Sequence, residues 1–306
     1  MLRTFRVGLV AAGICWVSMA HASFDGGAFQ ARTDRRYPDV LKYLGTLESS
    51  YPGTSSRFVL GKSDSGAEIQ GIKIGSGPVK AMIVAAHHGN EYGSTEVALA
   101  AASEFSARPL PNYTVFIIPV LNVGGYNARN REEKSPVGSH DPNRDYPGPC
   151  GSDSEFALKS TRALAEFIDK EQVVTSATLH TYYPAVVYPW GFATHDLETD
   201  YQKEFEDLVR AGASESRYET GNSTKVIYPA NGTFEDYAFW KSGVWSLLYE
   251  LGFSHFPSVR DIEEMVRVNV PGLRAQIEVA PKTRAVKHAF TGRCDDGLRL
   301  LDRRDE

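Results

Sequence analysis

The stretch KAMIVAAHHGNE, residues 80–91, runs from an apolar segment directly into two histidines and a glutamate. Similar short apolar, β-branched runs occur at residues 113–120, 172–179, 185–190 and 244–250. Runs that are apolar on both faces and alternate with helices are typical of a mostly parallel sheet covered by helices. The sequence therefore predicts an α/β fold: one domain with a mostly parallel or mixed twisted sheet and helices on both faces.

Three segments between and around these runs have helical periodicity, at residues 38–51, 154–170 and 258–279. Proline lacks the N–H that a helix interior uses, and its ring clashes with the preceding turn. We therefore expect Pro271 to kink or divide the last of the three helices.

The composition is that of a globular protein with a full hydrophobic core. Of the 306 residues, 42% are apolar and 23% are charged. The net charge of -5 and the lack of a long Lys/Arg run argue against nucleic-acid binding, so we expect a small or peptidic partner. We also expect a monomer. Glycine patterns for a serine-hydrolase elbow, a phosphate loop or a dinucleotide site are missing, which excludes those classes of enzyme.

The first 22 residues have the pattern of a secretory signal. Two arginines in MLRTFR precede the apolar stretch VGLVAAGICWVSM, and a small-x-small cleavage site, AHA, follows at residues 20–22. The apolar stretch is too short to cross a membrane. We expect a secreted or periplasmic protein without a membrane anchor after signal removal. In an oxidising compartment Cys150 and Cys294 can form a disulfide, and two free thiols are the alternative.

Ionisable side chains stand at the ends of three of the apolar runs. His88 and Glu91 follow the first, His180 follows the run at 172–179, and Glu250 ends the last. Open α/β sheets place their sites at the carboxyl ends of strands. Burying these groups is costly unless they are coordinated or paired. A single metal ion would remove that cost for all four.

Zinc suits this set of ligands. Two imidazoles and one carboxylate with an open position form a catalytic zinc pattern, and a further carboxylate can act as base on the water. His88 and Glu91 are three residues apart, so one turn can aim both at the same ion. We expect the neighbouring His87 to point the other way, packed or hydrogen-bonded in the sheet. A second His-x-x-Glu pair, His195 and Glu198, follows a loop-like stretch and is expected at the surface.

Five segments, taken in chain order, resemble the zinc carboxypeptidase family of the carboxypeptidase A type. They are FVLGKSDSGAEIQGIKIG, VLNVGGY, SHDPNRDYPG, TLHTYYPAVVYPWG and ELGFSHFPSVRDIEEM. The resemblance covers nearly the whole chain after the signal. It implies a carboxypeptidase-like domain at residues 23–285, followed by a tail at 286–306. It also implies hydrolysis of the C-terminal peptide bond of peptides.

Carried over residue by residue, the resemblance implies that His88, Glu91 and His180 hold Zn²⁺. It implies that Glu250 activates the water.

On the substrate side, the resemblance implies that Asn143 and Arg144 grip the terminal carboxylate and that Tyr228 caps the bound C-terminus. A bidentate guanidinium suits a carboxylate, and cationic donors stabilise a developing oxyanion. The arginine that polarises the scissile carbonyl is expected in NARNREEK, residues 127–134. Arg129 is preferred because asparagine follows it, and Arg131 is the alternative.

Three residues depart from the family pattern. Asn90 replaces an arginine, and Thr181 stands where serine is common; Thr181 and Tyr182 are both expected in the substrate site. Asp145 follows Arg144 where asparagine is usual, and it adds a negative charge near the carboxylate grip.

Glu235 stands fifteen residues before Glu250, at the position that forms the floor of the specificity pocket in the family. A carboxylate there favours a C-terminal Lys or Arg, because an apolar guest would leave it desolvated and unpaired. A wall residue with an amino group, such as diaminopimelate, is a variant. The alternative is that Glu235 and Asp236 form a solvated turn, and an insertion of one residue would exchange their roles.

Other functions on the same scaffold stay open. A deacylase for acylated amino acids or an amidase for cell-wall stem peptides would keep the zinc and the base but change the carboxylate grip. Asn143, Arg144 and Tyr228 together favour the carboxypeptidase. A catalytically silent peptide-binding protein is a further alternative, and the presence of Glu250 argues against it.

Overall fold

The computed structural model describes residues 29–152 and 154–294. The predicted signal, residues 1–22, and the end of the predicted tail lie outside the described residues. The strands are β1 (Ser55–Lys62), β2 (Glu68–Ile74), β3 (Val79–Ala85), β4 (Tyr113–Ile118), β5 (Glu133–Ser135), β6 (Gly138–His140), β7 (Thr175–His180), β8 (Ala185–Tyr188), β9 (Glu219–Asn222) and β10 (Trp245–Glu250). The helices are α1 (Tyr37–Ser50), α2 (Tyr92–Ala107), α3 (Val123–Ala128), the 3₁₀ helix η1 (Pro142–Arg144), α4 (Lys159–Lys170), α5 (Gln202–Gly212), α6 (Ser223–Val226), α7 (Phe234–Ser242) and α8 (Val259–Val279).

Eight of the strands form one mixed sheet in the order β1-β2-β4-β3-β7-β10-β8-β9. The central pairs β4/β3, β3/β7 and β7/β10 are parallel, whereas β1/β2, β2/β4 and β10/β8 are antiparallel. Every residue of β4 and β7 is buried, as expected for parallel strands covered on both faces. The carboxyl ends of β3, β7 and β10 therefore meet at one edge of the sheet.

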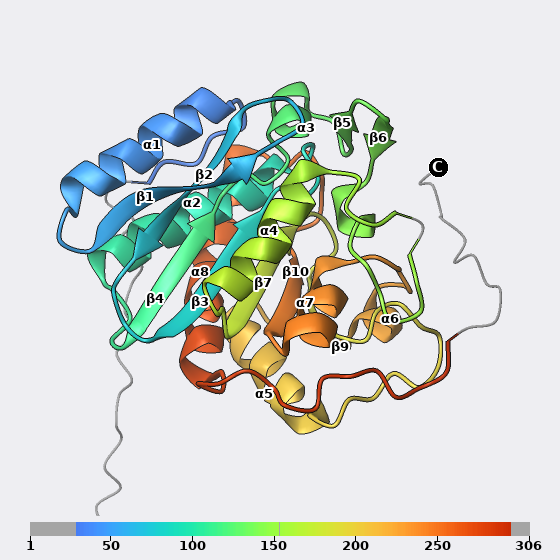
Figure 1. Ribbon diagram of the computed structural model, residues 1–306. Coiled ribbons are helices and arrows are strands. Elements are labelled where there is room, and N and C mark those ends of the chain that lie inside the picture. The colour runs from blue at the N-terminus through green and yellow to red at the C-terminus, as the bar shows by residue number, and fades with distance from the viewer. Residues whose placement is uncertain (1–28, 153, 295–306) are drawn as a thin grey trace, which may run out of the picture.

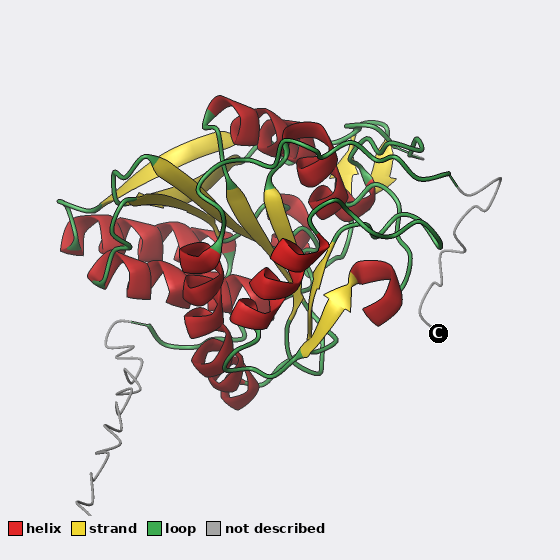
Figure 2. Ribbon diagram, turned by 90° about the horizontal axis from the view of Figure 1, so that it is seen from below, coloured by secondary structure: helices red, strands yellow, loops and turns green. Residues whose placement is uncertain are grey.

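Helices cover both faces of the sheet (Figures 1 and 2). Helices α2, α5 and α8 pack side by side on one face, and α4 and α7 cover the other. This arrangement confirms the α/β fold with helices on both faces. No helix in the described part of the chain is long and apolar enough to cross a membrane.

Two of the helices expected from the sequence differ from the prediction. Helix α4 begins at Lys159, not near residue 154, because the main-chain N–H groups of Ala157 and Leu158 donate to the carboxylate of Asp145. Helix α8 runs through Pro271 undivided, so the expected division does not occur. Buried residues flank that proline, and a Cβ on Gly272 would lie 2.0 Å from the carbonyl oxygen of Gly212 in α5. This packing against α5 outweighs the cost of proline inside a helix, about 3 kcal/mol.

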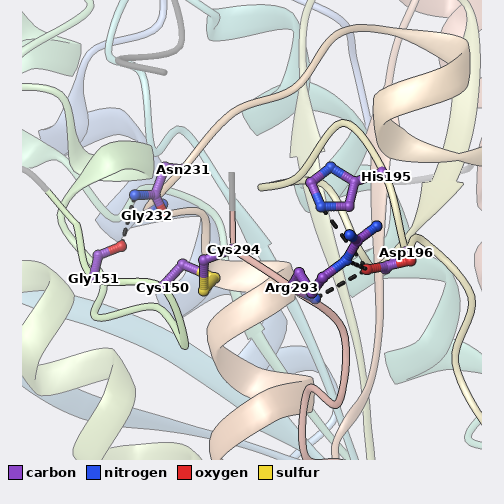
Figure 3. Close-up of a disulfide and its surroundings, with 8 residues drawn as sticks. All are labelled: Cys150, Gly151, His195, Asp196, Asn231, Gly232, Arg293 and Cys294. Carbon is purple, nitrogen blue, oxygen red and sulfur yellow. Dashed lines mark hydrogen bonds and ion pairs between the residues drawn. A yellow bond between two sulfur atoms is a disulfide. The ribbon is translucent and has the colours of Figure 1, made fainter. Parts of the chain in front are cut away.

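Beyond α8, residues 281–294 form a C-terminal strap that crosses the surface and ends at a disulfide. The main-chain N–H of Ala285 donates to the carbonyl of Gly243, and the ring of Phe290 packs on Phe192 with centroids 4.8 Å apart. The strap ends at the Cys150–Cys294 disulfide (Figure 3), which confirms the paired alternative.

The loop that carries Cys150 is joined to a second loop beside it. The side-chain amide of Asn231 donates to the carbonyl oxygen of Gly151 at 2.6 Å, as Figure 3 shows. In the same view the main-chain N–H of Arg293 donates to Asp196 at 3.0 Å. The disulfide therefore fastens the strap to a pair of connected surface loops.

Candidate active site

The three expected metal ligands lie together at the carboxyl edge of the sheet. His88 follows β3, Glu91 is the N-cap residue of α2, and His180 ends β7. His88 Nδ1 lies 2.7 Å from Glu91 Oε1, and His180 Nδ1 lies 3.1 Å from Glu91 Oε2. All three side chains are buried, and their ligand atoms fall within 4.8 Å of one another. The turn that brings them together needs Gly89, because a Cβ there would lie 2.0 Å from the backbone of Gly125.

The chemistry of this cluster fits a divalent cation. The two Nδ1 atoms of His88 and His180 lie 3.2 Å apart and both face the same carboxylate. Burial alone would raise the pKa of Glu91, but His88 and His180 lower it overall, so the carboxylate is ionised. Two imidazole nitrogens and one ionised carboxylate around a common point match the ligand set of catalytic zinc sites.

Asp141, which was not expected from the sequence, contacts the cluster at the ring nitrogen of His88 that faces away from Glu91. One carboxylate oxygen lies 3.0 Å from His88 Nε2 and accepts the main-chain N–H of Asn143 at 2.8 Å. The other accepts Nε and Nη2 of Arg131 at 3.0 and 2.8 Å. Burial alone would raise the pKa of Asp141, yet His88 and Arg131 hold it well below its usual value. Its place in SHDPNRD, two residues before Asn143, was the available signal.

Of the two candidate arginines, the structure brings Arg131 to the cluster and not the preferred Arg129. Arg131 Nη1 lies 3.2 Å from His88 Nδ1. Arg129 is the C-cap residue of α3, with a left-handed φ of 55°. Its guanidinium donates to the carbonyl of Arg35 at 2.6 Å and lies 4.8 Å from the ring centre of Tyr92. The left-handed turn directs Arg129 toward the N-terminal segment, so the geometry favours the alternative, Arg131, as the arginine of the site.

Glu250 is the last residue of β10 and pairs in register with His180 on the neighbouring parallel strand. Its Oε2 atom is buried and has no hydrogen-bond partner among the described residues. Burial and the negative charge of Glu91 raise the pKa of Glu250 well above its usual value. A carboxylate with a raised pKa beside a set of candidate metal ligands is suited to take up and release a proton.

Asn143 and Arg144 lie in η1, and Tyr228 lies in the loop after α6. Arg144 Nη2 donates to the hydroxyl of Tyr228 at 3.3 Å. The amide oxygen of Asn143 accepts the main-chain N–H of Phe234 at 2.9 Å, which leaves the NH₂ group as a donor. The structure therefore joins the expected Arg144 and Tyr228 directly, and Asn143 stands beside Arg144 in the chain.

The residues after His180 lie between the cluster and the surface. The main-chain N–H of Thr181 donates to Glu91 Oε2 at 3.1 Å, and its hydroxyl is buried without a partner among the described residues. Tyr182 is half exposed and packs edge-on against His255, with centroids 4.8 Å apart.

Both acidic residues at the start of α7 are buried, so the solvated-turn alternative is wrong. Glu235 Oε1 accepts the hydroxyl of Thr178 in β7, two residues before His180. Asp236 accepts the main-chain N–H of Gly191 at 2.9 Å, and burial raises the pKa of Asp236 to about 8. The two carboxyl groups therefore have different partners, and Glu235 is the one that contacts the strand of the cluster.

Three other residues from the sequence analysis can be located. The carboxylate of Asp145 accepts hydrogen bonds from the hydroxyl of Thr161 and from three further donors in the segment that leads into α4. These hydrogen bonds direct the carboxylate toward the start of α4. His87 is fully buried and its Nε2 lies 3.1 Å from the hydroxyl of Tyr146, as expected for a packed and hydrogen-bonded residue. His195 lies in a surface loop beside Asp196.

Comparison with known proteins gives consistent results. A family model described as zinc carboxypeptidase matches residues 40–272. Carboxypeptidase B of Astacus astacus is 26% identical over 68% of this chain and 82% of its own length. Zinc carboxypeptidase A 1 of Drosophila melanogaster is 28% identical over 70% of this chain and 60% of its own length. The structure of bovine thrombin-activatable fibrinolysis inhibitor, solved with tick carboxypeptidase inhibitor, aligns with a TM-score of 0.70, 17% identity, and coverage of 80% of this chain and 97% of that chain.

Proposed function

Because this chain belongs to the zinc carboxypeptidase family, and is therefore a metallocarboxypeptidase hydrolase that uses Zn²⁺, we propose that it removes single basic residues from the carboxyl end of peptides. The observation that carries the proposal is the buried His88, Glu91 and His180 cluster with the raised-pKa carboxylate of Glu250 beside it. The Arg144 and Tyr228 pair supports recognition of a free carboxylate.

Zinc held by the cluster would lower the pKa of a water molecule and polarise the scissile carbonyl. Glu250 takes the proton from the attacking water and later gives it to the leaving amine. Arg131 stabilises the negative charge that develops on the carbonyl oxygen. Asp141 holds the Arg131 guanidinium by two hydrogen bonds, so that the charge is in place before the substrate arrives.

The substrate is positioned by residues outside the metal-binding cluster. Arg144 and Asn143 bind the terminal carboxylate, and Tyr228 closes over the bound residue from its half-exposed position beside Arg144. Thr181 and Tyr182 contact the residues that precede the scissile bond. This arrangement supports an exopeptidase, because the guanidinium of Arg144 is suited to pair with a free terminal carboxylate.

The proposed basic preference rests on Glu235. Its carboxyl group is buried against Thr178, and its negative charge contributes to the raised pKa of Glu250, so the group lies on the side of the base. A cationic side chain would neutralise Glu235, whereas an apolar one would leave the carboxylate buried and unpaired. Diaminopimelate is a weaker candidate because its side chain carries a second carboxylate, which Glu235 would repel.

The deciding experiment compares kcat/KM on matched peptides that end in Arg, Lys, Phe and Leu. We expect the basic peptides to be preferred by about tenfold or more, because leaving a buried polar group unpaired costs about 1–3 kcal/mol. Glu235→Gln should reduce that preference, and Glu198→Gln on an exposed loop is the matched control. A preference for Phe or Leu would refute the specificity and leave the exopeptidase activity intact.

Acylated amino acids and muropeptides, tested in the same assay, separate the deacylase and cell-wall amidase alternatives. Glu250→Gln should lose activity on every peptide, and full activity in that variant would refute the proposed base. Zinc removal by a chelator should also abolish activity, and re-addition should restore it. A protein that binds C-terminal peptides without cleaving them would support the silent binding alternative.

We also propose that the chain acts outside the cytoplasm as a monomer. The signal pattern at residues 1–22 and the Cys150–Cys294 disulfide support an oxidising compartment. Fractionation of cells that express the full chain, with N-terminal sequencing of the mature protein, tests the cleavage after residue 22. Size-exclusion chromatography with light scattering tests the monomer.

A further inference from the structure

The two histidines of the metal cluster are held in different ways. The second ring nitrogen of His88 lies 3.0 Å from Asp141, the usual arrangement for a histidine that binds a metal. The second ring nitrogen of His180, Nε2, is buried and has no hydrogen-bond partner among the described residues. A different contact must therefore fix the rotation of the His180 ring.

That contact is the face of His87. The rings of His87 and His180 are stacked, with centroids 5.4 Å apart and an angle of 26° between their planes. His88 meets the same ring edge-on, at 4.8 Å and 62°. His180 is thus bracketed by two consecutive histidines of the loop after β3. The surrounding protein is close-packed, so a ring held on its face and its edge loses most of its freedom to rotate.

The ring of His87 is fixed in turn by Tyr146. His87 Nε2 lies 3.1 Å from the Tyr146 hydroxyl, and both residues are fully buried. Tyr146 packs edge-on against Phe234 at 5.3 Å, and its main-chain N–H donates to Gly232 at 3.1 Å. Tyr146 is therefore held at both its ring and its main chain, and its hydroxyl contacts the imidazole of His87 from this fixed side.

A polar ring at this position is not explained by packing alone. His87 lies against aromatic rings, including Phe234 at 5.9 Å, and its Nδ1 atom is buried without a partner among the described residues. An unpaired buried nitrogen costs free energy that an apolar side chain would not. In a folded protein such a group calls for a specific reason. Orientation of the neighbouring metal ligand supplies that reason.

We infer that His87, held by Tyr146, is the positioning residue for the zinc ligand His180, in place of the hydrogen-bonded partner that orients His88. The inference rests on zinc binding by the cluster and goes beyond the proposed peptidase activity. His87 and Tyr146 contact no reacting atom in this arrangement. Their contribution is to the affinity for the metal and to its coordination geometry.

The test measures metal binding without any peptide substrate. Tyr146→Phe removes only the hydroxyl, whereas His87→Leu removes both the ring and its hydrogen bond. We expect both variants to release zinc to a chelating dye about three- to tenfold faster than the unmodified protein, less than the 10- to 100-fold typical of a direct hydrogen-bond partner. The visible absorption spectrum of the cobalt-substituted protein should also shift in both variants, because the coordination geometry of the metal changes. His87→Gln, which keeps a planar acceptor, should recover part of the loss.

Tyr37→Phe is the matched control, because Tyr37 is a buried tyrosine whose hydroxyl donates to Glu68 at 2.7 Å far from the cluster. It should lower the stability without changing zinc release or the cobalt spectrum. The inference is overturned if Tyr146→Phe and His87→Leu behave like this control. If His87→Leu fails to fold, Tyr146→Phe alone decides. Zinc binding by the unmodified protein is the baseline, so failure of the peptidase proposal and failure of this inference are separate results.

Discussion

Replacing Asp141 by asparagine should weaken either zinc binding or catalysis, depending on which contact of the carboxylate is lost. Asp141 contacts both His88, at 3.0 Å, and Arg131, at 2.8 Å. Asn keeps the shape of the side chain and one acceptor, but its NH₂ group would face either a donor of Arg131 or the ring nitrogen of His88. One charge-assisted contact is therefore lost or reversed whichever way the amide turns.

Hydrogen bonds to charged groups contribute about 1.5–3 kcal/mol each. The Asp141 side chain is 20% exposed, so the lower half of that range applies, and the expected loss is about 1.5–2 kcal/mol. At about 1.4 kcal/mol per factor of ten, this corresponds to a decrease of roughly 10- to 30-fold in zinc affinity or in kcat/KM. That value lies within the range of about 10- to 100-fold found for partners of metal-binding histidines.

Zinc affinity is measured by competition with a chelating dye, and kcat/KM is measured separately at saturating zinc. The first reports the His88 contact and the second reports the Arg131 contact. Asp261→Asn is the control, because Asp261 is an exposed residue in the capping box of α8. It should change neither quantity. If Asp141→Asn leaves both within twofold of the unmodified protein, Asp141 does not organise the site.

Three further outcomes are expected. Arg131→Ala should lower kcat/KM by about 100-fold or more in steady-state assays, as loss of an oxyanion donor does. Arg129→Ala should mainly lower the melting temperature. The reverse result would restore Arg129 as the catalytic arginine. Cys294→Ser should lower the free energy of unfolding in a denaturant titration by about 2–5 kcal/mol, and an unchanged midpoint would contradict a stabilising disulfide. Burial raises the pKa of Asp236 from 3.8 to about 8, so the folded state keeps a proton that the unfolded chain releases. The contribution of Asp236 to the free energy of unfolding is thus fully present below about pH 4 and is lost as the pH rises to about 8. Urea titrations across this pH range should show that the free energy of unfolding falls less steeply with pH in Asp236→Asn than in the unmodified protein. Parallel curves for the two proteins would contradict the raised pKa.

The polar residues at the ends of the central strands could be predicted because the sequence pattern that marks them is local. A run that is apolar on both faces and then ends in His88, or in Glu250, is unusual enough to mark both a buried strand and a site. Parallel pairing of β3, β7 and β10 then brings those ends together without further information. Helix α2 was not predicted from periodicity, because it is buried on all sides and shows no polar face.

The choice between Arg129 and Arg131 could not be made from spacing. The two residues lie in an irregular segment after α3, where neither a helical nor a strand period fixes the direction of a side chain. The left-handed conformation of Arg129 reverses the chain at that point and sends the two guanidinium groups to opposite sides. Asp141 was missed for a related reason, since its role depends on a contact with His88, 53 residues earlier.

The metal side and the substrate side of the site are supported by different parts of the molecule. His88, Glu91 and His180 are fixed by the buried ends of the central strands and by α2. The loop of Arg144 instead reaches the loop of Tyr228 through the hydrogen bond between Gly151 and Asn231, and the disulfide ties that pair of loops to the C-terminal strap. We therefore expect a change in the strap to alter the loops of Arg144 and Tyr228 while His88, Glu91 and His180 stay in place. Loops tolerate changes in sequence better than the strands that carry them, so the two sides of this site can vary independently.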